Sequence, residues 1–113
     1  MKDSLTQENS SDYVNLIISL ANTAITQTEG VAQGAGKQKR GLRSRSSVRE
    51  GTHVYIGGTT VTVDVYVDVI FGYSVPQVAC ELQEKIIRAI KENTPLTPGA
   101  INVNVTNAIF LSI

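Results

Sequence analysis

Residues 59–71 read TTVTVDVYVDVIF, and this stretch decides the fold. Valine alternates with threonine, aspartate or tyrosine, which is the two-residue period of a β-strand with one apolar and one polar face. Only the apolar face of such a strand has to be buried against other elements of the fold, and the polar face can remain in solvent. The sequence therefore predicts a sheet with helices on one side and an open polar surface on the other.

A β-hairpin is predicted directly before this strand, where HVYI (53–56) is followed by Gly57-Gly58. A two-residue Gly-Gly turn joins antiparallel strands tightly. With Gly57-Gly58 as the turn, Val54 faces Val61, so apolar side chains meet on one face and polar side chains on the other.

Two amphipathic helices are predicted to cover the apolar face. In the first, apolar residues recur at helical spacing from Tyr13 to Ile25, and Gly30 can follow its last turn. In the second, Ser74 is the expected N-cap, and an apolar stripe runs from Val78 to Ile90.

Two further strands complete the pattern. A short strand is expected around Val31, and residues 101–111 alternate again, which would place Phe110 on the polar side. The order α-β-β-β-α-β predicts an α+β two-layer sandwich, with a small, mainly antiparallel sheet and two helices on one face.

The chain has 113 residues, which suffices for one domain. Residues 1–11 are polar and are expected to be a disordered lead. Residues 12–113 then form a single α+β domain. Within it, residues 34–51 are rich in Gly, Ser and Arg and are expected to be a flexible basic loop.

The charge is strongly divided, although the formal net charge is zero. No acidic side chain lies between Lys37 and Arg49, and outside this span the chain carries four basic and ten acidic side chains, a formal charge of −6. Such a loop can contact an anionic surface. The residues predicted to do so are Lys37, Lys39, Arg40, Arg43, Arg45 and Arg49.

Three readings of the basic loop stay open: a solvated connector, a contact with anionic lipid or an acidic protein, and a contact with nucleic acid. Nucleic acid is possible but not favoured. The chain has no G-x-x-G loop of the kind that clamps RNA, and the loop has no aromatic residue on which bases could stack.

Nucleotide binding is not predicted, even though the loop contains Gly36-Lys37. A phosphate-binding loop has the pattern G-x-x-x-x-G-K-[ST], but Val31 stands at the first glycine and Gln38 at the final hydroxyl position. We therefore expect no cofactor and no small-molecule substrate.

No catalytic or metal site is predicted either. Asp64 and Asp68 are four residues apart on one strand, so they lie roughly 13 Å from each other and are expected to face solvent. His53, the single histidine, offers too few ligands for a metal. Cys80, the single cysteine, is expected to be a small buried filler, and a chain without a cysteine pair suits a reducing, cytoplasmic location.

Three stretches carry a resemblance to a known family. They are TEGV (28–31), VTVDVYVDVIFGYSVPQVACELQEKI (61–86) and INVNVTNAIF (101–110). In this order they resemble the alkaline shock protein twenty-three family, also called the Gls twenty-four family. The positions that carry the resemblance are Glu29, Gly30, Val31, Asp64, Gly72, Asn102, Val103 and Val105.

The resemblance implies a non-enzymatic bacterial protein that self-associates in the cell-envelope stress response and homeostasis. It also implies a cytoplasmic location, at the inner face of the membrane through a membrane-anchored protein. The alternatives are a nucleic-acid- or regulatory-protein-binding module that uses the basic loop, or a regulator of lipid metabolism.

The polar side of the sheet is the expected surface for protein contacts, because tyrosine combines contact area with a hydrogen-bonding end. The residues predicted for this surface are His53, Tyr55, Tyr66, Asn104 and Phe110.

Overall fold

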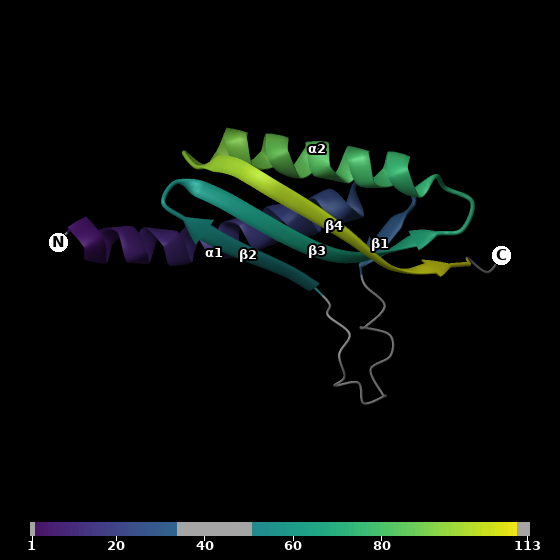
Figure 1. The fold of residues 1–113 in the computed structure, drawn as a ribbon, viewed down its shortest axis with the longest axis horizontal. Coiled ribbons are helices and arrows are strands. Elements are labelled where there is room, and N and C mark those ends of the chain that lie inside the picture. The colour runs from purple at the N-terminus through teal and green to yellow at the C-terminus, as the bar shows by residue number, and fades with distance from the viewer. Residues whose placement is uncertain (1, 34–50, 111–113) are drawn as a thin grey trace, which may run out of the picture.

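The computed structural model describes residues 2–33 and 51–110. The elements follow the order α1 (Lys2–Thr26), β1 (Val31–Gln33), β2 (Gly51–Gly57), β3 (Thr60–Ile70), α2 (Val75–Asn93) and β4 (Thr97–Ile109). This order and the packing of two helices on a four-stranded sheet confirm the predicted α+β class (Figure 1).

Strand β3 lies at the centre of the sheet. Strand β4 pairs with it in parallel over its whole length, so β1 and β2, which are antiparallel to β3, share its opposite edge. Gln33 lies opposite Val67 and Gly51 lies opposite Tyr66. The end of β1 and the start of β2 therefore occupy consecutive positions on one edge of the sheet.

The core is aliphatic and lies between β3 and the two helices. The alternating valines of β3 are at most 2% exposed, as the sequence pattern predicted. Helix α1 contributes Ile17, Ala21, Ala24 and Ile25, and α2 contributes Val78, Leu82, Ile86 and Ile90. Ser74 caps α2 and accepts a hydrogen bond from the backbone N–H of Gln77 at 3.4 Å.

Helix α1 begins at Lys2, so the prediction of a disordered lead over residues 1–11 is wrong for residues 2–11. The segment contains neither proline nor glycine, the two residues that most oppose a helix. Once the amphipathic part nucleates a helix, adding further turns toward the N-terminus requires little additional free energy.

The hairpin turns one residue later than predicted. Gly57 pairs with Thr60, and Val54 lies opposite Val63 rather than Val61. Only Gly58 of the two loop residues has a positive φ, 65°, which matches a type II′ turn with glycine at its first central position. The register differs by two residues, and a shift of two leaves every side chain on its predicted face.

Strand β4 contains two register shifts, and each inserts one residue relative to β3. The second lies at Thr106 and reverses the alternation beyond it, so that Ile109 lies opposite Ile70. Phe110 then packs against Phe71 at the end of the sheet, with ring centroids 4.5 Å apart. The prediction that Phe110 shares a face with Tyr66 is therefore wrong.

Candidate interaction surface

We call the sheet face turned away from both helices the outer face. It is formed by His53 and Tyr55 of β2, Thr62, Asp64 and Tyr66 of β3, and Asn102 and Asn104 of β4. Four residues predicted for protein contacts, all except Phe110, are thus brought together by the register of the three strands.

Side-chain contacts hold this outer face in order. The Asn102 side chain donates a hydrogen bond to Asp64 Oδ1 at 2.7 Å, and the Asn104 side chain donates to the carbonyl of Val65 at 3.3 Å. The rings of His53 and Tyr66 meet edge to face at 5.9 Å. Tyr55 remains 52% exposed. The surface is therefore polar and aromatic, with its amides already oriented by the sheet.

Asp68 is buried, with 1% of its surface exposed, so the prediction that it faces solvent is wrong. The hydroxyl of Thr106, the extra residue of the second register shift, lies 2.8 Å from Asp68 Oδ1 and 3.2 Å from the carbonyl of Val67, and its single proton is donated at the shorter distance, to the carboxylate. One bulge residue therefore supplies a donor to a buried carboxylate.

The six basic residues predicted to contact an anionic surface, from Lys37 to Arg49, lie outside the described residues. The flanking positions are described. Strand β1 ends at Gln33 and strand β2 begins at Gly51, and these two residues lie opposite neighbouring residues of β3. Gly51 has a φ of 86°. The two described positions that flank the basic segment therefore lie next to each other along β3.

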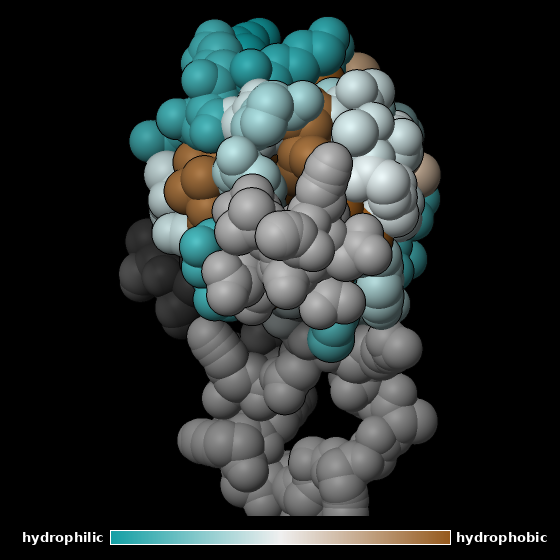
Figure 2. Space-filling view, turned by 90° about the vertical axis from the view of Figure 1, so that its left-hand side faces the viewer, coloured by the Kyte–Doolittle hydropathy of each residue, from teal (hydrophilic) through white to brown (hydrophobic). Residues whose placement is uncertain are grey.

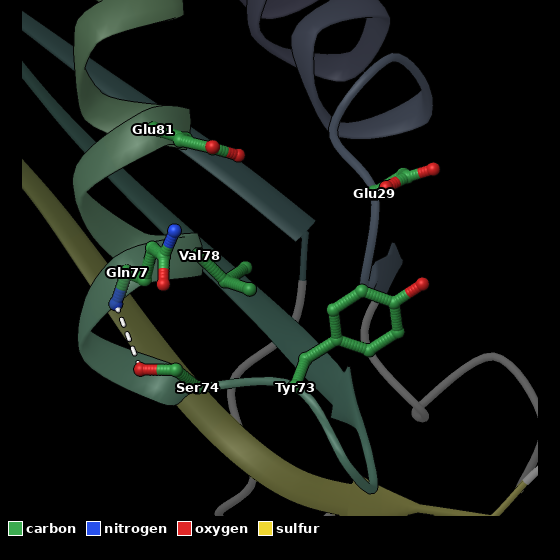
Figure 3. A pocket seen from close by; sticks show the side chains of 6 residues that line it. All are labelled: Glu29, Tyr73, Ser74, Gln77, Val78 and Glu81. Carbon is green, nitrogen blue, oxygen red and sulfur yellow. Dashed lines mark hydrogen bonds between the residues drawn. The ribbon is translucent and has the colours of Figure 1, made fainter.

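A small pocket of about 140 Å³ lies where the α1–β1 turn meets the start of α2. Figure 3 shows Glu29 and Tyr73 on one side of it and Glu81, on α2, on the other. Gly30 packs against the Tyr73 ring so closely that a Cβ would lie 2.6 Å from Tyr73 Cγ. Sequence reasoning missed this pocket, because Glu29 and Glu81 are far apart in the chain.

Within residues 12–32 and 51–110, no three His, Cys, Asp or Glu side chains lie close enough together to hold a metal ion. Cys80 is exposed, not buried as predicted, and its Sγ lies 3.8 Å from Glu84 Oε2. It lies two residues from both Val78 and Leu82, and two residues turn an α-helix by about 200°, so Cys80 faces away from the buried stripe.

No helix among the described residues is both long and apolar enough to cross a membrane. Figure 2 shows the end of the molecule at which α2 stops and the hairpin turns. Its coloured surface is mostly hydrophilic or neutral, and the apolar areas on it are small and separate. The coloured part of this surface therefore shows no broad apolar patch.

The family model of the alkaline shock protein twenty-three family, described as having a cell envelope-related function, matches residues 4–110. The chain belongs to this family. The match agrees with the resemblance read from the three sequence stretches, and it gives the chain a cell envelope-related function. The structure places Glu29 in the lining of the pocket and Gly30 against the Tyr73 ring that also lines it, and it joins Asp64 to Asn102 on the outer face.

A curated relative is the uncharacterized protein YqhY of Bacillus subtilis (strain 168). It is 31% identical over 94 residues, which are 80% of this chain and 70% of the relative. No solved structure matches the chain.

Proposed function

We propose that this member of the alkaline shock protein twenty-three family is a non-enzymatic, self-associating scaffold in cell-envelope stress response and homeostasis. It acts at the cytoplasmic side of the membrane, where a membrane-anchored protein holds it. The observation that carries this proposal is the outer face, which no element of the described chain covers and whose side chains are already ordered.

The chemistry of the outer face suits protein contact better than catalysis. Asn102 is hydrogen-bonded to the Asp64 carboxylate and Asn104 to the backbone carbonyl of Val65, so these side chains can receive a partner without first being ordered. The exposed ring of Tyr55 adds contact area and a hydrogen-bonding hydroxyl. A flat surface of this kind fits another folded protein.

Self-association is tested by replacing Tyr55 with lysine and measuring the molar mass by light scattering across a concentration series. Tyr55→Lys adds a charge to the outer face and should lower the mass of the assembly. Asn15→Lys is the matched control, because it adds the same charge at an exposed position of α1. A mass that Tyr55→Lys leaves unchanged would refute contact through the outer face.

The membrane-anchored partner is tested in cells by following the tagged chain with and without candidate membrane proteins. The chain should lie at the cell periphery when its partner is present and spread through the cytoplasm when the partner is deleted. A distribution that no such deletion changes would contradict the proposed attachment.

A further inference from the structure

Strand β4 has a regular window from Ile101 to Val105 between its two register shifts. The window pairs with Val63–Val67 of β3 on one side, and no other strand of the described chain pairs with it on the other side. No charged side chain occurs from Asn93 to Ile113. Exposed edge strands usually carry charges that keep copies of a protein apart, and this edge has none.

The backbone of this window presents alternate residues to the open edge. Thr97 donates its N–H to the carbonyl of Thr59, and Ile109 accepts from the N–H of Phe71, so both residues face toward β3. Each register shift reverses the alternation, so residues 101, 103 and 105 face away from β3. In agreement, the carbonyl of Ile101 accepts a hydrogen bond from the side chain of Gln83, on α2, at 2.8 Å.

The window reads Ile-Asn-Val-Asn-Val, and this pattern is nearly palindromic about Val103. In an antiparallel pair of two such strands centred on Val103, Ile101 would lie opposite Val105 and Asn102 opposite Asn104. Apolar side chains would meet on the helix side and amides on the outer side. The centre of the palindrome is also a residue whose backbone faces the open edge, as hydrogen-bonded pairing requires.

We propose that β4 is a self-pairing edge, on which a second copy of this chain docks its own β4 antiparallel about a twofold axis through Val103. This inference rests on the self-association proposed above and gives the copies a second contact, separate from the outer face. The window can form about six backbone hydrogen bonds between the copies, because three residues of each strand face the edge. The Ile101 carbonyl can accept from the second copy while Gln83 occupies its other lone pair.

A second copy fits this edge better than an unrelated strand, because only a self-partner needs a sequence that pairs with its own reverse. Val105, which is 38% exposed, would gain an apolar neighbour in Ile101 of the second copy. The twofold axis is perpendicular to the sheet, so both outer faces point the same way. Pairing therefore doubles the proposed contact surface for other partners.

The test is disulfide cross-linking in a Cys80→Ser background, which removes the single natural thiol. One preparation carries Asn102→Cys and a second, with a different tag, carries Asn104→Cys. In the proposed register these positions form a non-hydrogen-bonded pair, with Cα atoms about 4.5 Å apart, within the range that a disulfide spans. Mild oxidation should join the two variants when they are mixed.

Each variant oxidised alone is the matched control, because residue 102 does not lie opposite residue 102, nor residue 104 opposite residue 104. The expected result is several-fold more cross-linked product in the mixture than in either variant alone. The product should persist when both chains also carry Tyr55→Lys, since the edge does not require the outer face.

The outcomes separate the two proposals. An oligomeric parent protein whose mixture gives no excess of cross-link overturns the paired edge and leaves self-association through the outer face intact. Equal cross-linking in the mixture and in the single variants overturns the antiparallel register. A parent protein that stays monomeric at every concentration overturns both proposals.

Discussion

Gly30 lies directly against the ring of Tyr73, and a Cβ on Gly30 would come within 2.7 Å of two ring carbons. The contact joins the turn after α1 to the loop between β3 and α2. The carbonyl of Gly30 also accepts a hydrogen bond from the N–H of Ile70 at 2.8 Å. The turn after α1 and the loop between β3 and α2 are far apart in the sequence, and these contacts hold them together at one end of the sheet.

The first prediction is that Gly30→Ala destabilises the fold. Gly30 has a φ of +89°, and a residue with a side chain in such a conformation costs about 1–3 kcal/mol. The collision with Tyr73 adds to this cost unless the ring moves. Denaturant unfolding should therefore show a loss of free energy of unfolding at the upper end of that range.

Tyr73→Ala provides the control for this prediction. Combined with Gly30→Ala, it removes the collision but not the backbone strain, so the double variant should lose less than the sum of the two single losses. Strictly additive losses would show that the ring yields freely and that only the backbone matters.

The second prediction concerns Thr106, whose hydroxyl donates to the buried carboxylate of Asp68. Thr106→Val keeps the shape of the side chain but removes the donor. Leaving a buried acceptor without this hydrogen bond should lower the free energy of unfolding by about 1–3 kcal/mol. Thr62→Val on β3 is a matched control, and a loss of the same size there would mean that the Thr106 hydrogen bond contributes nothing specific.

The third prediction tests the packing of α2. Leu82 is fully buried, so Leu82→Ala should lower the free energy of unfolding by about 2–5 kcal/mol through lost burial and a cavity. The exposed residue Glu92, on the same helix, provides the comparison, and Glu92→Ala should change the stability by no more than about 0.5 kcal/mol. Similar values for the two variants would contradict the packing of α2 on the sheet.

The face of each side chain on β3 could be predicted, because the two-residue period needs no knowledge of the neighbouring strands. The hairpin register could not, since a shift of two residues satisfies the same alternation and adjacent glycines allow either turn. No sequence pattern indicated the bulge at Thr106, because a bulge depends on the register in which β4 pairs with β3. For that reason the burial of Asp68 and the position of Phe110 were both mispredicted.

The candidate site was predictable to the same extent. His53, Tyr55, Tyr66 and Asn104 followed from alternation alone, because each lies in a regular part of its strand. The contact between Gly30 and Tyr73 joins segments that only the folded sheet brings together, so no local pattern could reveal it. The near-palindrome from Ile101 to Val105 is visible in the sequence. Its proposed role in pairing depends on which edge of β4 has no neighbouring strand among the described residues, and only the folded sheet shows that.

The last prediction concerns the basic segment, whose residues lie outside the described ones. Each Lys or Arg gains about 1 kcal/mol beside an anionic leaflet, and the gain decays over a Debye length of about 8 Å at physiological salt. Arg40→Glu with Arg43→Glu should therefore weaken binding to vesicles that contain anionic lipid, measured by co-sedimentation. Raising the salt concentration should weaken the binding of the parent protein too.

Arg88→Glu with Lys91→Glu is the matched control, because it makes the same change in net charge at two exposed positions of α2. This control should bind vesicles almost as well as the parent protein, if the basic segment rather than the total charge makes the contact. If the two double variants lost vesicle binding equally, the loss would follow from the net charge of the protein and not from the basic segment. Vesicle binding that did not change with salt concentration would exclude an electrostatic contact. Tighter binding to single-stranded nucleic acid than to vesicles of matched charge would favour a nucleic-acid-binding role for the segment instead, because phosphates attract the same arginines through the same salt-dependent interaction.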